Sequence, residues 1–495
     1  MSLINISNMT FSYERNCDNI FNNVSLQLDT DWKLGFTGRN GRGKTTFLNL
    51  LLGKYQYSGS ISASVEFEYF PFEVSDKDMQ TIEIVESISH DHLRWELLRE
   101  MSLLELSEEI LYRSFVTLSN GEQTKILLAA LFLKENNFLL IDEPTNHLDM
   151  HGREIVSDYL RKKKGFILVS HDRDFLDGCI DHILSINKTN IEIQRGNFSS
   201  WLTNKERQDS FEFSENEKLK KDIRRLEQTA REKSVWSNVA ESRKIGFNPD
   251  KTEKSIGRRP SEGVKSKKMM KRAKTIESRR QTAIEEKSLL LRNIENAERL
   301  KIKQLEYHSS RLVSLENVSI YYGEKAACQD VSLTIDKGDR IALCGKNGSG
   351  KSSILKLISG ENLAYKGSLI IGSRLVITFV SQDTSFLKGD LADYSQKKGI
   401  DESLFKAILR KLDFERVQFE KNMEDFSGGQ KKKVLIAGSL CEKAHLLVWD
   451  EPLNFIDVLS RIQIEELLLE YKPTIILVEH DSRFCRDIAT KTVQL

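Results

Sequence analysis

The segment GRNGRGKTT at residues 38–46 decides the fold, and it returns as GKNGSGKSS at residues 345–353. Both copies fit the pattern GxxxxGK[ST], in which glycines let the backbone wrap around a phosphate before a helix begins. Each copy also follows an apolar segment that is typical of a β-strand. The pair therefore predicts two phosphate-binding loops, with Lys44 and Lys351 directed at the β- and γ-phosphates of a nucleotide.

Further motifs recur in the same order, so the chain contains an internal duplication. VSLQL (24–28) matches VSLTI (331–335), LSNGEQ (118–123) matches FSGGQ (426–430), FLLIDEP (138–144) matches LLVWDEP (446–452), and VSHDRDF (169–175) matches VEHDSRF (478–484). Nearly uninterrupted apolar runs that alternate with helical stretches are typical of strands covered on both faces. The predicted fold class is α/β, with two phosphate-loop domains that each contain a mainly parallel sheet.

The segment between the two copies has a different composition. Residues 205–306 contain 28 Lys and Arg against 18 Asp and Glu, a net charge of +10, whereas the whole chain carries +1. Apolar residues at spacings of three and four predict helices of about 60 Å each over 205–245 and 265–306, packed as an antiparallel hairpin. Residues 245–264 have no period and are predicted as the loop at its tip. The predicted organisation is a nucleotide-binding domain at 1–204, a helical linker at 205–306 and a second nucleotide-binding domain at 307–495.

The remaining composition excludes several classes of protein. No apolar run is long enough to cross a bilayer and the N-terminus shows no signal pattern, so we expect a soluble cytoplasmic protein. The six cysteines are scattered singly, without a CxxC pair. This predicts reduced thiols in cores and neither a metal site nor a disulfide framework.

An Asp-Glu pair closes an apolar strand in each copy, at Asp142-Glu143 and at Asp450-Glu451. The aspartate at a strand end suits the shell of a Mg²⁺ ion, and the glutamate beside it suits activation of an attacking water. The alternative is an ordinary solvated charge pair, but the preceding apolar run argues against it.

The hydroxyl groups of Thr45 and Ser352 also suit Mg²⁺. His171 and His480 follow the next apolar strand of each copy and could contact the γ-phosphate, although an isolated histidine is more often a plain surface or core residue.

Together, the phosphate-binding loops, the LSGGQ-like signatures, the Asp-Glu strand ends and the histidines resemble the ABC ATPases. Two cassettes in one chain, a long helical linker and no membrane segment resemble the ABC-F group of translation factors. The resemblance implies hydrolysis of ATP with Mg²⁺, and a head-to-tail closure in which each nucleotide lies between one phosphate-binding loop and the signature of the other cassette.

The resemblance also assigns the site residues. For ATP binding by the first cassette it implies Tyr13, Gly38, Asn40, Gly41, Gly43, Lys44, Thr45 and Thr46, and by the second cassette Tyr322, Gly345, Asn347, Gly348, Gly350, Lys351, Ser352, Ser353 and Gln382. The signatures that would close over the opposite nucleotide are Ser119, Asn120, Gly121 and Glu122, and Ser427, Gly428, Gly429 and Gln430. It makes Glu143, Glu451, His171 and His480 catalytic, and Thr45, Asp142, Ser352, Gln382 and Asp450 ligands of Mg²⁺. Tyr13 and Tyr322 would stack on adenine.

The sequence departs from the family pattern in three places. Phe72 stands where the first cassette should match Gln382, and Asn120 stands where a signature glycine is usual. After the second Asp-Glu pair, the usual PTNHLD reads PLNFID at residues 452–457. We therefore expect the two sites to hydrolyse ATP unequally.

The stretches TDWKLGFTGRNGRGKTT (30–46), RKKKGFILVSHDRDF (161–175) and ENEKLKKDIRRLEQTAREKSVWS (215–237) resemble the Lsa type within the antibiotic-resistance branch of the ABC-F group. Phe72 and Leu118 are 46 positions apart, and Gln382 and Phe426 are 44 apart, so the arm that housekeeping members often insert there is missing. This resemblance implies binding to the bacterial 70S ribosome, near the peptidyl transferase centre of 23S rRNA and P/E-site tRNA. It also implies protection from lincosamides, pleuromutilins and streptogramin A, by a monomer whose cassettes pair with each other. The alternatives are a housekeeping ABC-F translation factor and the ATPase motor of a drug exporter.

The charge of the linker independently favours an RNA target. Residues 243–274 contain 12 Lys and Arg against 3 Asp and Glu. Such a density of positive charge attracts phosphates through counterion release. Phe247, Arg258 and Arg259 are the predicted contacts of the tip with the ribosome or the drug site. The alternative is a linker that only spaces the cassettes, with Phe247 packed on Trp236 to close the hairpin.

Overall fold

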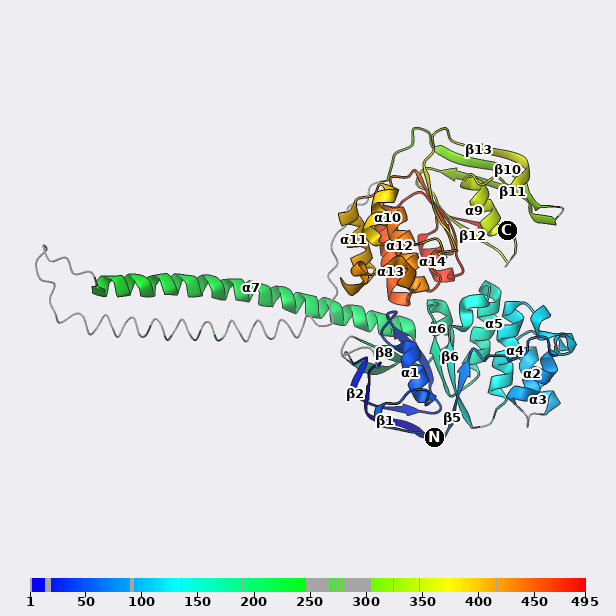
Figure 1. Cartoon of the computed structure of the whole chain (residues 1–495), viewed down its shortest axis with the longest axis horizontal. Coiled ribbons are helices and arrows are strands. Elements are labelled where there is room, and N and C mark those ends of the chain that lie inside the picture. Colours follow the sequence, from blue (N-terminus) through cyan, green and yellow to red (C-terminus); the bar gives the residue numbers. More distant parts are fainter. Residues whose placement is uncertain are drawn as a thin grey trace, which may run out of the picture. The chain divides into compact units, whose positions relative to one another are not determined.

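The computed structural model describes residues 2–13, 19–89, 93–134, 136–187, 190–245, 304–323, 325–346, 348–414 and 416–495, and between 246 and 303 only Lys268, Lys271, Thr275 and Ser278. The chain divides into two units. Met1–Trp201 and Ala297–Leu495 form the first, which contains both cassettes, and Leu202–Asn296 forms the second (Figure 1).

A six-stranded sheet forms the centre of the first cassette, in the order β5-β6-β7-β3-β8-β9. All neighbouring strands are parallel except β8 and β9. The strands are β3 (Lys33–Gly38), β5 (Glu66–Phe70), β6 (Asn137–Asp142), β7 (Phe166–Val169), β8 (His182–Ile186) and β9 (Ile191–Arg195). A second, antiparallel sheet has the order β2-β1-β4 and consists of β1 (Leu3–Phe11), β2 (Phe21–Asp29) and β4 (Ser58–Ser62).

Helices α1 to α6 complete the first cassette. They are α1 (Lys44–Leu51), α2 (Thr81–Ile88), α3 (Arg94–Leu103), α4 (Asn120–Phe132), α5 (Met150–Arg161) and α6 (Arg173–Cys179), with 3-10 turns at Glu108–Tyr112, Phe115–Thr117 and Pro144–His147. Helix α1 begins directly after the first phosphate-binding loop, α4 begins at the first signature, and the turn at Pro144–His147 follows the Asp-Glu pair.

The second cassette repeats this plan. Its five-stranded sheet is parallel throughout, in the order β14-β15-β16-β12-β17. These strands are β12 (Arg340–Cys344), β14 (Ile377–Val380), β15 (Leu446–Asp450), β16 (Ile475–Val478) and β17 (Lys491–Gln494). The antiparallel sheet β11-β10-β13 consists of β10 (Arg311–Tyr322), β11 (Lys325–Asp336) and β13 (Ala364–Ile371). The helices are α9 (Lys351–Ile358), α10 (Leu391–Lys398), α11 (Glu402–Lys411), α12 (Gly428–Cys441), α13 (Val458–Tyr471) and α14 (Ser482–Ile488), with 3-10 turns at Arg416–Glu420 and Met423–Asp425.

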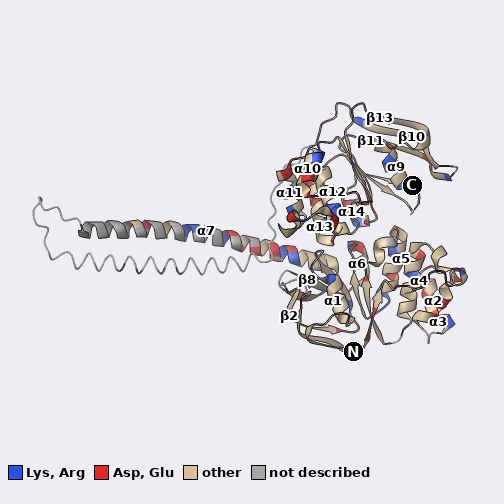
Figure 2. Ribbon diagram, viewed as in Figure 1, with Lys and Arg blue, Asp and Glu red and all other residues tan. Residues whose placement is uncertain are grey.

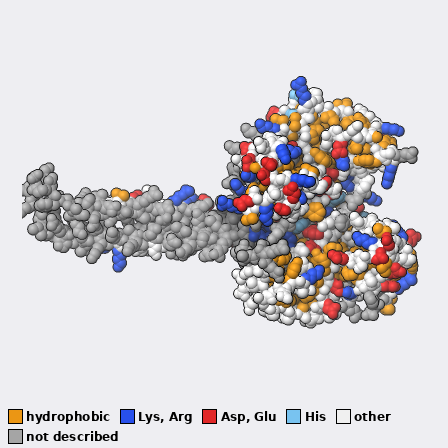
Figure 3. Space-filling model, in the orientation of Figure 1, with side chains coloured by type: hydrophobic (Ala, Val, Ile, Leu, Met, Phe, Trp, Pro, Cys, Tyr) orange, Lys and Arg blue, Asp and Glu red, His pale blue; other side chains and the backbone are white. Residues whose placement is uncertain are grey.

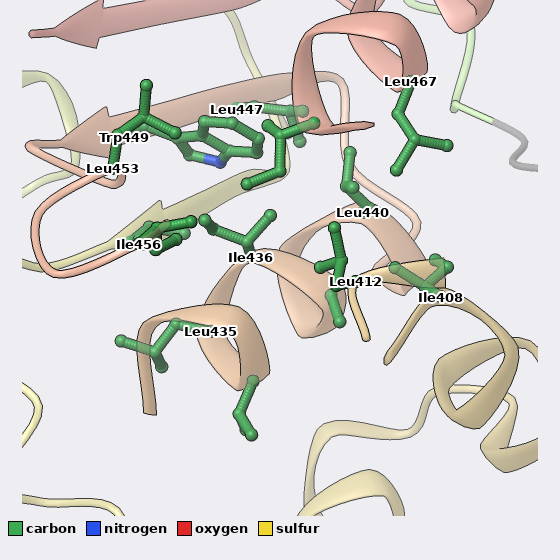
Figure 4. Close-up of a cluster of buried hydrophobic side chains, with 14 of the residues drawn as sticks. Ile408, Leu412, Leu435, Ile436, Leu440, Leu447, Trp449, Leu453, Ile456 and Leu467 are labelled. Atoms are coloured by element: carbon green, nitrogen blue, oxygen red, sulfur yellow. The ribbon is translucent and has the colours of Figure 1, made fainter. Parts of the chain in front are cut away.

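The apolar strands are buried on both faces because successive side chains point to opposite sides of a sheet. In β15, Leu446 and Val448 pack with α9 and the antiparallel sheet. Leu447 and Trp449 instead join the core formed by α10 to α14 (Figure 4). The predicted α/β fold with two mainly parallel sheets is therefore confirmed, and the continuous apolar runs reflect this double burial.

Helix α7 (Phe198–Ile245) begins the linker and confirms the predicted helix over residues 205–245. Its 48 residues correspond to about 72 Å. Figure 2 shows that basic and acidic residues alternate with others along its described part. Lys268, Lys271, Thr275 and Ser278 are helical, as predicted for the second segment. The predicted end of that helix is wrong, because residues 304–306 are not helical. The tip loop and the antiparallel packing of the hairpin lie outside the described residues.

The cassettes carry a mixed surface. In the view of Figure 3, acidic and basic side chains are scattered among hydrophobic ones over their described surface. Because residues outside 205–306 sum to a net charge of −9, the excess of positive charge belongs to the linker segment. No helix in the described ranges has both the length and the apolar character needed to span a membrane.

Trp449 offers a test of the packing that places the second Asp-Glu pair. It is fully buried directly before Asp450, and its indole Nε1 donates a hydrogen bond to Ser439 Oγ in α12 at 2.9 Å. We expect Trp449→Ala to lower the free energy of unfolding by about 3–5 kcal/mol, because it opens a cavity in the core. The position of the urea unfolding transition measures this. Trp95→Ala, whose side chain is 56% exposed on α3, is the control and should cost less than about 0.5 kcal/mol. Equal losses in both variants would contradict the packing.

Candidate functional site

The first phosphate-binding loop connects β3 to α1. Gly43 caps α1 with a left-handed backbone (φ 93°), and a Cβ there would lie 2.7 Å from Ile20 Cγ2. Only glycine suits both conditions. Lys44 is buried, and its Nζ donates to Gly38 O at 2.6 Å and to Asn40 Oδ1 at 3.3 Å. The ammonium group therefore lies across its own loop, where successive backbone N–H groups can face a phosphate.

The second phosphate-binding loop has the same geometry between β12 and α9. Gly350 is left-handed (φ 88°), and a Cβ there would lie 2.7 Å from Ala327 O. Lys351 Nζ donates to Gly345 O at 2.9 Å and to Lys346 O at 2.8 Å. Asn347, also expected in this loop, lies outside the described residues.

A hydroxyl and a carboxylate meet beside each loop. Thr45 Oγ1 donates to Asp142 Oδ2 at 3.2 Å, and Ser352 Oγ donates to Asp450 Oδ1 at 3.1 Å. The Tyr69 hydroxyl also donates to Asp142, at 3.0 Å. Among the described residues, no group of three or more His, Cys, Asp or Glu side chains could hold a metal by itself. Two hard oxygen donors at each site instead fit Mg²⁺, which typically binds through one or two protein oxygens, substrate phosphates and water.

Glu143 lies against His171 in the first cassette. Its Oε1 is 3.2 Å from His171 Nε2, and its backbone is left-handed (φ 50°). Burial, helped by the charge of Asp142, raises the pKa of Glu143 to about 8. Burial and the positive charges of Lys44 and Arg461 hold the pKa of His171 well below its usual value. The histidine is therefore neutral at pH 7.

Glu451 in the second cassette is held by more partners. Gln382 Nε2 and Asn454 Nδ2 both donate to its Oε2, each at 2.7 Å, and His480 Nε2 lies 3.5 Å from its Oε1. Burial acts to raise the pKa of Glu451, but His480, Asn454 and the charge of Lys432 outweigh it and lower the pKa. The second glutamate is therefore fixed and ionised at pH 7, unlike its counterpart.

The two tyrosines expected to stack on adenine occupy equivalent places. The Tyr13 hydroxyl lies 2.9 Å from Thr46 Oγ1, and the Tyr322 hydroxyl lies 3.2 Å from Ser353 Oγ. Each hydroxyl contact thus ties a tyrosine to the first turn of the helix after the loop. A hollow of about 370 Å³ opens beside Tyr322 and is lined also by Lys325, Ala326, Ala327, Gly348, Gly350, Lys351, Ser352, Ser353 and Glu451.

Both signatures form helix N-termini. Ser119 accepts a hydrogen bond from the backbone N–H of Glu122 and begins α4, and Ser427 does the same with Gln430 at the start of α12. Each of these capping boxes fixes the start of its helix, which is a favourable place for an anion. Asn120 and Gly428 are the first residues of these helices, and Gly121 and Gly429 the second.

Contacts between the cassettes bring part of the predicted first site together. Asn40 Nδ2 donates to Phe455 O at 2.7 Å, and Gly429 lies against both residues, since a Cβ there would be 3.1 Å from Asn40 Nδ2. Arg39 Nε pairs with Asp413 Oδ2 at 3.2 Å. The first phosphate-binding loop therefore meets the signature and the 452–457 loop of the second cassette.

The second site receives a reciprocal contact. Arg153 Nη1 in α5 of the first cassette donates to the backbone oxygen of His480 at 3.0 Å. Among the described residues, no hydrogen bond or ion pair joins Ser119, Asn120 or Gly121 to the second phosphate-binding loop. The structure thus brings more of the first composite site together than of the second.

Two residues with direct contacts to Glu451 had no predicted role. Asn454 belongs to the PLNFID segment that departs from the family pattern, and Lys432 lies two residues after the second signature. A signal for Lys432 exists in the sequence, because KKK at 431–433 places charges on every face of a helix that begins at the buried signature.

Each cassette has a phosphate-binding loop with its lysine, a hydroxyl–carboxylate pair and a glutamate–histidine pair. These features define a P-loop nucleoside triphosphatase with two sites. The family model described as ABC transporter matches residues 21–146 and 328–454, just over half of the chain. The chain belongs to the ABC transporter family, and its two cassettes are ATPase domains.

Curated relatives match nearly the whole chain. The ribosome protection protein VmlR of Bacillus subtilis (strain 168) is 27% identical over 487 residues, which cover 96% of this chain and 83% of the relative. The ATP-binding protein Uup of Buchnera aphidicola subsp. Acyrthosiphon pisum is 27% identical over 511 residues and covers 99% and 80%. ABC transporter F family member 2 of Arabidopsis thaliana is 25% identical over 552 residues and covers 99% and 76%. These similarities support the ABC-F group.

Solved structures support the twin-cassette fold. The crystal structure of the complex of the archaeal ribosomal stalk protein aP1 and the archaeal ribosome recycling factor aABCE1 matches with a TM-score of 0.64, at 19% identity, covering 98% of this chain and 87% of that one. The RNase-L Inhibitor matches with a TM-score of 0.59, at 18% identity, covering 94% and 83%. At these identities the likeness concerns the fold alone.

The different surroundings of the two glutamates generate a prediction about the separate sites. We expect Glu143→Gln and Glu451→Gln, made singly, to leave unequal residual ATPase rates, since only Glu451 is fixed by Gln382 and Asn454. Phosphate release under saturating ATP measures both rates on protein prepared in parallel. Two residual rates that each equal half of the wild-type rate would show that these surroundings do not matter.

Proposed function

We propose that this protein is an ABC-F ATPase that binds the bacterial 70S ribosome and protects it from antibiotics of the peptidyl transferase centre. The observation that carries the proposal is the net charge of +10 in residues 205–306, between two cassettes that lack such an excess. Positive charge at this density favours a polyanion recognised by shape, such as folded RNA. Similarity to a relative named a ribosome protection protein supports the same target.

In this proposal the linker and the cassettes have different roles. The linker tip enters near 23S rRNA of the peptidyl transferase centre and P/E-site tRNA, where lincosamides, pleuromutilins and streptogramin A bind. The cassettes pair within one cytoplasmic monomer and couple ATP hydrolysis to release from the ribosome. Resemblance to the Lsa type and the short segment between Phe72 and Leu118 favour this branch over housekeeping members.

In the proposed chemistry, each site holds Mg²⁺ through a hydroxyl and an aspartate: Thr45 with Asp142, and Ser352 with Asp450, joined by Gln382. Bound Mg²⁺ would neutralise charge that develops on the phosphates. Glu451 and, once it has lost its proton, Glu143 act as general bases toward the attacking water, and His171 and His480 contact the γ-phosphate. The distances between each glutamate and its histidine, 3.2 Å and 3.5 Å, support these roles.

Removing both bases tests this chemistry. We expect Glu143→Gln with Glu451→Gln to bind ATP normally and to lose hydrolysis by a factor of about 10²–10⁴, the usual contribution of a positioned base. The double variant should remain bound to ribosomes in the presence of ATP, which pelleting through a sucrose cushion measures. A wild-type rate of hydrolysis in this variant would reject the assignment.

The tip is tested by separating drug protection from ribosome binding. Phe247, Arg258 and Arg259 lie outside the described residues, so their roles rest on the sequence. Phe247→Ala should reduce resistance to a lincosamide and a pleuromutilin while ATPase activity and ribosome binding persist, because stacking on a base contributes about 1–3 kcal/mol. Arg258→Ala with Arg259→Ala should weaken ribosome pelleting and flatten its salt dependence, since phosphate contacts produce that dependence.

The control for the tip variants is Lys268→Ala, a single basic residue on the helical shoulder of the tip. It should change resistance less than either tip variant at matched expression. Full resistance in both tip variants would indicate that the linker only spaces the cassettes. Resistance that disappears while the variants cofractionate with membranes would favour an exporter motor.

A further inference from the structure

Lys432 in α12 is a lysine buried in the core of the second cassette. Its side chain is 1% exposed, and its ammonium Nζ points at three backbone carbonyl oxygens. The distances are 2.9 Å to Ser381 O, 3.0 Å to Glu451 O and 3.5 Å to Asp450 O. No role in binding ATP requires this side chain, because it reaches backbone on the core side of the site.

A buried ammonium group is costly unless each of its protons has an acceptor. Lysine has three N–H donors, and the three carbonyls supply an acceptor for each. Burial lowers the pKa of Lys432, whereas the carboxylates of Glu479, Asp450 and Glu451 act to raise it. The three carbonyl acceptors and the nearby carboxylates thus offset the cost of burying this group.

The three carbonyls belong to the two segments that form the second site. Ser381 directly precedes Gln382, and Asp450 and Glu451 form the strand end. The side chains of Gln382 and Glu451 are joined by the 2.7 Å hydrogen bond from Nε2 to Oε2. Lys432 therefore connects the segment of Ser381 and Gln382 to the end of β15 through hydrogen bonds to the backbone of both. The side chains of these two segments meet at the edge of the sheet where we propose that hydrolysis takes place.

The first cassette lacks both parts of this arrangement. Five residues after the capping serine, α12 has Lys432 and α4 has Thr124, and Phe72 replaces the counterpart of Gln382. Threonine is too short to span the same distance. A hollow of about 580 Å³ occupies this region, lined by Phe72, Thr124 and Glu143 together with Phe70, Pro71, Glu73, Val74, Lys77, Phe115, Asn120, Gln123, Leu127, Asp142, Pro144 and Asn146.

We propose that Lys432 is a positioning residue that holds Glu451 and the segment of Gln382 in register for hydrolysis at the second site. The proposal rests on the proposed role of Glu451 as the base of that site. It adds a cause for the inequality of the two sites: the backbone of the second site is held by a buried lysine side chain, and that of the first is not. Lys432 touches neither nucleotide nor water in this role and acts only through the groups it holds.

The test uses the full-length chain with ATP and Mg²⁺, in backgrounds where one base remains. With Glu143→Gln, which leaves the second site, Lys432→Met should lower kcat by about 100-fold, as expected for a displaced catalytic group. KM for ATP should change by less than about twofold, because the substitution removes no contact with ATP. With Glu451→Gln, which leaves the first site, Lys432→Met should leave the residual rate unchanged.

Matched variants separate positioning from damage to the fold. Lys431→Met changes the preceding, partly exposed lysine of α12 and should leave kcat unchanged in both backgrounds. Lys432→Gln keeps two donors without the charge and should give an intermediate kcat, so it provides a measurement if Lys432→Met does not fold. Equal losses from Lys432→Met in both backgrounds, or a change in KM alone, would overturn the role of Lys432.

The role of Glu451 as a base can be rejected independently of the role of Lys432. If Glu143→Gln and Glu451→Gln combined retain the wild-type rate, the role of Glu451 is wrong and this inference falls with it. If hydrolysis depends on Glu451 but Lys432→Met leaves kcat unchanged, only the role of Lys432 is overturned.

Discussion

The parallel pairing of strands is the constraint on which both sites depend. In a parallel sheet, the carboxyl ends of neighbouring strands meet at one edge. The strand before each phosphate-binding loop, the strand that ends in Asp-Glu and the strand before the histidine lie side by side, as β6-β7-β3 and β15-β16-β12. This order brings Thr45 to Asp142 and Ser352 to Asp450, although about a hundred residues separate each pair. The lysine, the hydroxyl group, the carboxylates and the histidine of each site lie close together because the strands that precede them all end at the same edge of the sheet.

The side chains that surround the glutamate at this edge of the sheet differ between the two cassettes. Glu451 receives two amide donors and lies above a buried ammonium, so its carboxylate is ionised and its orientation is fixed. Glu143 lies beside a hollow and a neutral histidine, and burial raises its pKa. The backbone is left-handed at both glutamates (φ 50° and 45°), so the strand end itself is conserved between the copies. The difference comes from the side chains packed beneath it.

The 452–457 loop connects the two cassettes through the first site. Phe455 has a left-handed backbone (φ 64°) that is unusual for a bulky residue, and its carbonyl oxygen accepts from Asn40. Asp457 at the end of the loop is fully buried and pairs with Lys433 at 3.2 Å. Burial acts to raise the pKa of Asp457, but Lys433, Arg39 and Lys44 hold it below its usual value. Charges from both cassettes therefore stabilise one carboxylate, which links the first phosphate-binding loop to the strand end of the second cassette.

The sequence by itself determined the duplication, the α/β class, both phosphate-binding loops, the Asp-Glu strand ends and the first linker helix. Each of these depends on residues close together in the chain, where spacing and glycine placement fix the local backbone. It placed the end of the second linker helix wrongly at residue 306, where Gln304 instead bonds His445 O of the second cassette. Only the tertiary structure decided that Lys432 lies beneath Glu451, that Asn454 joins Gln382 there, and that Asn40 meets Phe455. These contacts connect segments far apart in sequence, and a helical lysine or a loop asparagine has the same local signature whether it is solvated or buried against carbonyl oxygens.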